Sequence, residues 1–155
     1  MRVAIGADHG GFVLKRQLVR ALGAWGHEVA DLGTHSAARC DYPVYGQKVA
    51  QAVSSKAFDR GVLICKSGIG MSIVANKFPS VKAALCRSTK DAVLSREHND
   101  ANVLILGTND TGRQAALQML KVWLETAFAG ERHARRVKQI AQMERHLQGA
   151  VKGKG

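Results

Sequence analysis

Residues 61–70 read Gly-Val-Leu-Ile-Cys-Lys-Ser-Gly-Ile-Gly, an apolar run that ends in a cysteine and a glycine-containing loop. A short run of Val, Leu and Ile bounded by glycine is typical of a buried strand in a parallel sheet. Residues 71–76 then predict a helix. In open α/β sheets, ligands bind at the carboxyl ends of such strands. Because Gly68 and Gly70 let the backbone approach a ligand closely, the loop predicts an anion site next to Cys65.

Four further apolar runs alternate with helical patterns along the chain. The expected strands are residues 3–6, 27–32, 61–65, 81–86 and 102–107, and the expected helices are residues 12–25, 42–55, 71–76, 89–97, 111–128 and 131–147. This alternation favours an α/β fold: a single doubly wound, three-layer α/β/α domain with a five-stranded parallel sheet, Rossmann-like, and a C-terminal helix. We assign residues 1–150 to this domain and residues 151–155 to a disordered basic tail.

The charge narrows the choice of partners. The net charge is +11, aromatic residues make up 5%, and seven of the 23 Lys and Arg lie after Gly130 while the rest are spread along the chain. This distribution favours simple solubility or an anionic substrate over nucleic acid. There is no signal-peptide pattern and no apolar run of membrane-spanning length, and the three cysteines form no CxxC pair. We therefore expect a cytoplasmic protein with reduced thiols and no membrane partner.

Two nucleotide-binding motifs are excluded. The segment 68–70 lacks the third glycine of a dinucleotide fingerprint, and it lies in the third strand–helix unit rather than the first. Residues 6–11 lack the Gly-Lys-Ser/Thr ending of a P-loop. A plain tight turn remains the alternative for the loop at residues 68–70.

Three side chains invite a catalytic interpretation, each with an ordinary alternative. Cys65 is either a small buried hydrophobe or a thiolate stabilised by backbone amides and the Ser67 hydroxyl. His9, after Asp8 at the end of the first strand, and His98, before the last strand, are either surface histidines or part of a site. We expect both histidines on the sheet edge that holds the glycine loop, because right-handed crossovers bring strand tips together.

Two arginines near the C-terminus form a further candidate site. Arg132 and Arg136 are spaced i and i+4 on the last expected helix, so they lie on the same helix face. Arginine geometry suits a phosphate clamp, and a solvated helix face is the alternative.

Six segments carry a resemblance to a known family. They are Gly-Ala-Asp-His-Gly-Gly at 6–11, Asp-Tyr-Pro at 41–43, Cys-Lys-Ser-Gly-Ile-Gly at 65–70, Ala-Asn-Lys at 75–77, Ser-Arg-Glu-His-Asn-Asp-Ala-Asn at 95–102 and Arg-His-Ala-Arg-Arg-Val at 132–137. In this order and spacing, from residue 3 to about residue 140, the chain resembles the ribose-5-phosphate isomerase type B family, with its galactose-6-phosphate and allose-6-phosphate isomerase relatives.

The resemblance implies an isomerase that interconverts aldose and ketose phosphates through an enediolate, with no cofactor and no metal. It gives Cys65 the role of the base that moves a proton between C1 and C2, and it makes Ser67 the hydroxyl that assists at the sugar oxygens. His98, with Asp8 nearby, opens the sugar ring. The implied substrate contacts are the backbone N–H groups of Ser67, Gly68, Ile69 and Gly70 for the enediolate oxygen, His9, Arg132 and Arg136 for the phosphate, and Tyr42 and Asn99 for the sugar.

The sequence departs from the family pattern at several positions. Some members carry a glutamate base where this chain has Met71, which cannot ionise and so leaves Cys65. Ser67 replaces the usual threonine. Lys66 stands where a small residue, often glycine, is usual, and Asn109 stands where many members carry an arginine that reaches the phosphate of a neighbouring subunit. We therefore regard Lys66 and Asn109 as possible further substrate contacts.

The resemblance leads to one expected reaction and two alternatives. We expect isomerisation of ribose 5-phosphate to ribulose 5-phosphate, a step of the pentose phosphate pathway of carbohydrate metabolism, by a homodimer or homotetramer with sites shared between subunits. No nucleic-acid partner is expected. One alternative is another phosphosugar, such as a tetrulose phosphate, allose 6-phosphate or galactose 6-phosphate. The other is a non-catalytic phosphosugar-binding module.

Overall fold

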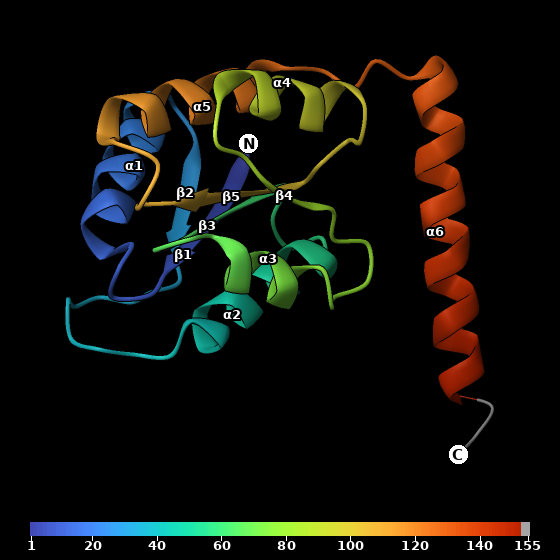
Figure 1. Ribbon diagram of the computed structural model, residues 1–155, viewed down its shortest axis with the longest axis horizontal. Helices are drawn as coiled ribbons and strands as arrows, with labels where there is room; N and C mark the ends of the chain where they lie inside the picture. Colours follow the sequence, from blue (N-terminus) through green and yellow to red (C-terminus); the bar gives the residue numbers. More distant parts are fainter. Residues whose placement is uncertain (153–155) are drawn as a thin grey trace.

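The computed structural model describes residues 1–152, and its strands and helices alternate as the sequence predicts (Figure 1). The strands are β1 (Arg2–Ala7), β2 (Glu28–Asp31), β3 (Arg60–Cys65), β4 (Ala83–Leu85) and β5 (Val103–Gly107). The helices are α1 (Phe12–Ala24), α2 (Tyr42–Ser54), α3 (Ile69–Ala75), α4 (Thr89–Glu97), α5 (Arg113–Glu125) and α6 (Glu131–Lys152).

The five strands form one parallel sheet in the order β2-β1-β3-β5-β4. Strand β3 lies at its centre, and Val62 pairs with Ile5 of β1 and with Leu104 of β5. Every residue of β5, and every residue of β3 after Arg60, is buried, as the continuous apolar runs predict. The predicted doubly wound α/β fold is therefore confirmed.

Helices cover both faces of the sheet (Figure 1). Because side chains alternate along a strand, Val62 and Ile64 of β3 pack on one side, where helices α1, α4 and α5 lie. Leu63 and Cys65 pack on the other side, under α2 and α3. The two apolar cores meet at β3, so the tip of this strand has a firmly fixed position.

Strand β4 is shorter than predicted, with three residues instead of six. The N–H of the preceding Lys82 donates to the side-chain carbonyl of Asn102 at 2.7 Å, while the Lys82 carbonyl still accepts from the Asn102 N–H at 3.0 Å. A local side-chain hydrogen bond thus takes the place of a backbone bond at the Lys82 N–H. Asn102 also reaches back to the Ser80 carbonyl, at 2.8 Å, and ties the two segments together before their strands begin.

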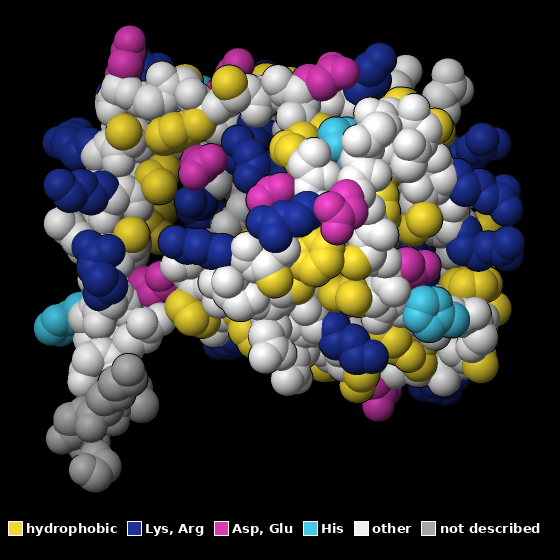
Figure 2. Space-filling view, turned by 180° about the vertical axis from the view of Figure 1, so that it is seen from behind, with side chains coloured by type: hydrophobic (Ala, Val, Ile, Leu, Met, Phe, Trp, Pro, Cys, Tyr) yellow, Lys and Arg dark blue, Asp and Glu magenta, His cyan; other side chains and the backbone are white. Residues whose placement is uncertain are grey.

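Helix α6 stands away from the three layers (Figure 1). One tie to the domain is made by Glu144, whose carboxylate accepts from the Ser80 N–H at 2.9 and 3.0 Å. Ile140, Met143 and Leu147 of this helix are exposed, Met143 by 63%. Lys and Arg side chains are scattered over the face of the molecule seen in Figure 2 and do not gather in one patch there.

The C-terminus differs from the expectation. Residues 151 and 152, which we assigned to the basic tail, continue α6, because the helical pattern does not stop at residue 147. Residues 153–155 of the expected tail lie outside the described residues. Among the helices of residues 1–152, none combines the length and apolarity needed to cross a membrane.

Candidate active site

The tip of β3 holds a cysteine against a tight glycine turn. The Cys65 Sγ accepts a hydrogen bond from the Gly68 N–H at 3.1 Å. Gly68 adopts a left-handed conformation with φ of 76°, and a Cβ at this position would lie 2.4 Å from Leu85 Cδ1. The backbone conformation therefore favours glycine here, and a Cβ would also have to displace the Leu85 side chain. The thiol faces backbone amides, as the sequence suggested.

Two opposing effects act on the Cys65 thiol. Burial raises its pKa above the ordinary value, and the Asp8 carboxylate adds to this rise. Hydrogen bonds from the N–H groups of Gly68, Met71 and Ser67 lower the pKa, but burial prevails. The thiol is therefore mostly protonated at neutral pH, and its thiolate is a stronger base than that of an ordinary cysteine.

The thiol opens into a cavity of about 580 Å³ at the carboxyl edge of the sheet. Its lining residues are Asp8, His9, Ala37, Arg39, Tyr42, Cys65, Lys66, Ser67 and Gly70. The cavity therefore unites, from three βα loops, most of the residues that the sequence singled out at this edge. Its volume falls within the range of small-molecule sites.

Asp8 and His9 are held by backbone groups. The Asp8 Oδ1 accepts from the N–H groups of Gly10 at 2.9 Å and Gly11 at 3.2 Å, which fixes the carboxylate at the end of β1. The His9 Nδ1 lies 3.2 Å from the carbonyl oxygen and 3.3 Å from the nitrogen of Cys40. Because Nδ1 is engaged by the backbone, Nε2 is the ring nitrogen available to a ligand.

Tyr42 begins α2 and lies directly against the glycine loop. A Cβ at Gly70 would be 2.5 Å from Tyr42 Cζ and 2.9 Å from its hydroxyl oxygen. Gly70 thus makes room for the phenol in the cavity wall. In the same loop the Ser67 Oγ accepts from the Ile69 N–H at 3.3 Å, while the Ile69 side chain is exposed.

Lys66 and Asn109, where the sequence departs from the family pattern, are neighbours. The Asn109 N–H donates to the Lys66 carbonyl at 2.9 Å. The Lys66 side chain passes over Gly10, since a Cβ on Gly10 would be 2.6 Å from Lys66 Cγ. Lys66 lines the cavity, and Asn109 does not. Lys66 is also absent from the charged groups that shift the pKa of Cys65.

The expectation that His98 shares this edge is wrong. His98 caps the C-terminus of α4, just before β5, and the first residue of β5, Val103, pairs with Gly61 at the start of β3. It therefore lies at the amino-terminal edge, whereas Cys65 lies at the carboxyl-terminal edge. A helix that follows a parallel strand returns the chain to the opposite edge, so its last residues lie far from the strand tips. Asn99 lies in the same turn as His98.

A second group of side chains surrounds His98. Its imidazole stacks on that of His133 in α6, with ring centroids 4.1 Å apart and an interplanar angle of 7°. The Arg132 Nε lies 3.4 Å from the His133 Nε2, and Arg136 follows one turn later on α6. Burial lowers the pKa of His133, and the charges of His98, Arg132 and Arg136 add to this effect. We call His98, Asn99, Arg132, His133 and Arg136 the histidine cluster.

A family model described as Ribose/Galactose Isomerase matches residues 3–140 of the chain, a range that includes both the cavity and the histidine cluster. The chain belongs to this family. It is 44% identical over 143 residues to ribose-5-phosphate isomerase B of Escherichia coli, a match that covers 92% of this chain and 96% of that protein. The membership that six short segments suggested is thus confirmed.

Solved structures of ribose/galactose isomerases also match. Ribose-5-phosphate isomerase B of Clostridium thermocellum superposes with a TM-score of 0.93 at 48% identity, covering 95% of this chain and 99% of that chain. Ribose-5-phosphate isomerase B of Mycoplasma genitalium, with bound ribulose 5-phosphate, superposes with a TM-score of 0.90 at 36% identity, covering 93% and 96%. The fold is therefore that of the family throughout.

Sequence reasoning assigned no role to Ala37 and Arg39 of the cavity or to His133 of the histidine cluster. Arg39 lines the cavity from the long loop before α2, where no periodic pattern predicts which side chain turns inward. Its place two residues before the Asp-Tyr-Pro segment was the available signal. His133 follows Arg132 in the first turn of α6 and is buried, and its stacking on His98 depends on how the start of α6 meets the end of α4.

Proposed function

We propose that the chain is an aldose–ketose isomerase that interconverts ribose 5-phosphate and ribulose 5-phosphate. The observation that carries this proposal is the Cys65 thiol at the β3 tip, hydrogen-bonded to a glycine-loop amide in a cavity of sugar-phosphate size. The names of the relatives support ribose 5-phosphate and do not favour the other phosphosugars or a binding module.

In this reaction, Cys65 is the base. Its thiolate takes the proton from C2 of the open-chain aldose, and the electron pair moves into a C1–C2 double bond, which leaves an enediolate oxygen on C1. The amides of Ser67 to Gly70 stabilise that charge. The thiol returns the proton to C1, while the Ser67 hydroxyl passes the O2 proton to O1 and so forms the ketose. No cofactor and no metal take part in these steps.

Ring opening needs an acid–base group next to the sugar ring, and we assign it to His98 of a second copy, with Asp8 beside it. Within residues 1–152 of one subunit, no hydrogen bond connects His98 to the cavity, and the two lie at opposite sheet edges. In a homodimer, the histidine cluster of one subunit can complete the cavity of the other, so that His98 reaches the sugar although His98 and the cavity lie apart within one chain. A homotetramer built from such dimers has the same sites.

The exposed apolar side chains support such an assembly. Ile140, Met143 and Leu147 extend along the free helix α6, and Ile69 and Ile73 of α3 are exposed beside the glycine loop. Exposed apolar side chains grouped on a helix face, as on each of these two helices, are typical of subunit contacts. Association through these faces brings α6 of one copy toward the Cys65 cavity of another.

Charge supports a phosphorylated substrate. His9 offers Nε2 inside the cavity, and Arg132 and Arg136 of the second copy add two guanidinium groups, which suit a phosphate dianion. Tyr42 and Asn99 contact the sugar hydroxyls. We further propose a cytoplasmic role in the pentose phosphate pathway, without a nucleic-acid or membrane partner.

The test is an assay of ketose formation from a panel of phosphosugars with the wild type and with Cys65→Ala. The variant should lose about 10²–10⁴-fold in kcat, because it lacks the positioned base. Cys86→Ala, which removes another buried thiol outside the cavity, is the control and should keep its activity. Faster turnover of galactose 6-phosphate or allose 6-phosphate than of ribose 5-phosphate would mean that the hexose phosphate is the substrate. Binding of these phosphosugars by the wild type without turnover would mean that the protein is a binding module.

A further inference from the structure

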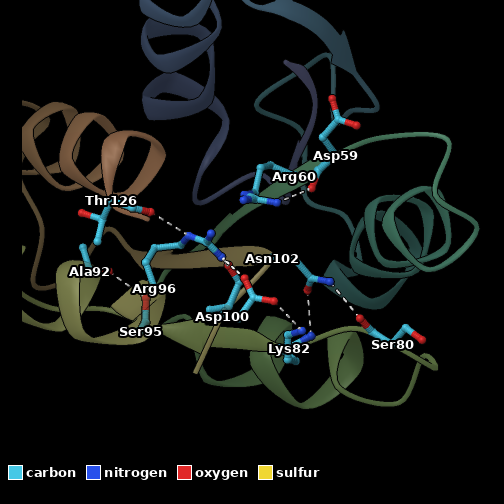
Figure 3. A network of polar contacts seen from close by, with 11 residues as sticks. Asp59, Arg60, Ser80, Lys82, Ala92, Ser95, Arg96, Asp100, Asn102 and Thr126 are labelled. Atoms are coloured by element: carbon cyan, nitrogen blue, oxygen red, sulfur yellow. Dashed lines mark hydrogen bonds and ion pairs between the residues drawn. The ribbon is translucent and has the colours of Figure 1, made fainter. Parts of the chain in front are cut away.

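A buried arginine, Arg96, stands two residues before His98 in the chain and makes polar contacts with Asp100 and Thr126 (Figure 3). The Arg96 side chain is 4% exposed, and its Nη1 donates to the Asp100 carboxylate at 2.8 Å and to the Ala101 carbonyl at 2.7 Å. The second carboxylate oxygen of Asp100 accepts from Lys82 Nζ at 3.0 Å. These contacts link the end of α4, the start of β5 and the strand beside it.

The Arg96–Asp100 pair encloses the catalytic candidates. Residues 97–99 lie between Arg96 and Asp100 in the chain. The ion pair joins the two ends of this segment, and so does the hydrogen bond from the Asp100 N–H to the Arg96 carbonyl, at 3.1 Å. Asp100 has a φ of 49°, a left-handed conformation that Asp and Asn tolerate better than other side chains do. The pair therefore holds the direction in which His98 and Asn99 leave the helix.

The same guanidinium holds the connection to α6. The Arg96 Nε donates to the Thr126 carbonyl at 3.3 Å, and three residues later the Ala129 N–H donates to the Glu97 carbonyl at 3.0 Å. The ring of the fully buried Trp123 lies 5.9 Å from Arg96 Cζ and supports the guanidinium from α5. Arg96 thus fixes both the His98 turn and the segment from which α6, with His133, begins.

We propose that Arg96 and Asp100 are positioning residues that hold His98 stacked on His133, and thereby set the geometry of the group that opens the sugar ring. This inference rests on the proposed function in one respect, the role of His98. The competing explanation is a buried ion pair that contributes to stability alone. The two differ in outcome, because a stability role affects all substrates equally, whereas misplaced ring-opening groups affect only substrates that arrive as rings.

The experiment compares Asp100→Ala and Asp100→Asn on ribose 5-phosphate and on a tetrose 4-phosphate, which cannot close a ring through its phosphorylated oxygen. Asn accepts the Arg96 hydrogen bond and tolerates the left-handed backbone, so Asp100→Asn should stay within about threefold of wild-type kcat. Asp100→Ala should lose at least about tenfold in kcat on ribose 5-phosphate, since small misplacements cost up to about 10²-fold, and less than about threefold on the tetrose phosphate.

Asp59→Ala is the matched control. Asp59 also pairs with an arginine, Arg2, at 3.2 Å, but the pair is exposed and none of its hydrogen bonds reaches α4 or residues 126–130. It should change neither rate. The NMR ring signals of His98 and His133 give a readout independent of turnover, because their mutual ring-current shifts require the stack. These shifts should persist in Asp100→Asn and disappear in Asp100→Ala.

Equal losses of Asp100→Ala on both substrates, or an unchanged histidine stack in that variant, would overturn the positioning role. If Asp100→Ala does not fold, Arg96→Lys replaces it, because lysine keeps the charge but not the bonds to Thr126 and Ala101, and the same substrate difference is expected. A failure of the proposed function looks different. In that case Cys65→Ala keeps its turnover, while the histidine stack still depends on Asp100.

Discussion

Replacing Gly68 by alanine tests the glycine loop more sharply than any other single change, because two separate features of the structure oppose it. The φ of 76° places residue 68 in the left-handed region, and the added Cβ would lie 2.4 Å from Leu85 Cδ1 and 3.3 Å from Ile105 Cγ2. The N–H of the same residue donates to the Cys65 thiol. The substitution therefore strains the backbone, crowds the core and disturbs the base together.

The expected magnitude follows from these two terms. A left-handed conformation costs a residue with a Cβ roughly 1–2 kcal/mol. Crowding a packed core costs a further 1–3 kcal/mol or so, at the lower end if Leu85 can rotate. Gly68→Ala should thus lower the free energy of unfolding by about 2–5 kcal/mol. Alanine keeps the backbone N–H, but the strained turn should move it away from the Cys65 thiol, so kcat/KM should fall because a hydrogen bond that lowers the pKa of the thiol is weakened.

Urea unfolding followed by tryptophan fluorescence measures the free energy of unfolding, and the rate of ketose formation measures kcat/KM. Gly23→Ala is the control, because Gly23 lies within α1 and a Cβ there meets nothing within 4 Å. It should stabilise the protein by about 0.5–1 kcal/mol without a change in activity. A loss below about 0.5 kcal/mol in Gly68→Ala, with unchanged kcat/KM, would refute the reasoning.

Three further outcomes are expected. Because burial raises the pKa of Cys65 and the reaction needs its thiolate, kcat/KM for ribose 5-phosphate should rise with pH from neutral up to that raised pKa, and a flat pH–rate profile over this range would exclude the thiol as the base. Arg132→Ala and Arg136→Ala should each raise KM about ten- to a hundredfold, because each variant loses a hydrogen bond to the phosphate. Unchanged KM values would show that both arginines belong to a solvated helix face and do not bind the phosphate. Lys66→Gly should raise KM, and adding Asn109→Arg should restore it, because Lys66 lines the cavity and Asn109 is its hydrogen-bonded backbone neighbour. A shift of the pH–rate profile in Lys66→Gly, with KM unchanged, would mean that Lys66 tunes the Cys65 thiol.

Local patterns predicted the part of the site built from strand tips. The apolar run that ends at Cys65 specifies a buried strand, and the glycines after it specify the tight turn, so both follow from neighbouring residues. Asp8 and His9 were placed correctly for the same reason, since the end of β1 lies beside the end of β3 in a parallel sheet. Side-chain packing did not have to be known for the loops after β1 and β3.

The histidine cluster was misplaced because its position depends on the path of the chain rather than on local sequence. His98 follows a helix instead of a strand, so it lies at the opposite edge. The stack on His133 depends on the turn of the chain through residues 126–131, where Gly130 and Glu131 have positive φ values. A non-glycine residue in that conformation has no clear signature in a single sequence.

The site shared between two subunits is the central claim, and subunit mixing tests it most directly. Cys65→Ala and His98→Asn homodimers should each be nearly inactive on ribose 5-phosphate. When the two variants are unfolded together and refolded as a mixture, half of the dimers should be mixed and carry one intact site each, so activity should return to about a quarter of the wild-type value. No recovery in a mixture shown to contain mixed dimers would contradict a site built from two copies of the chain.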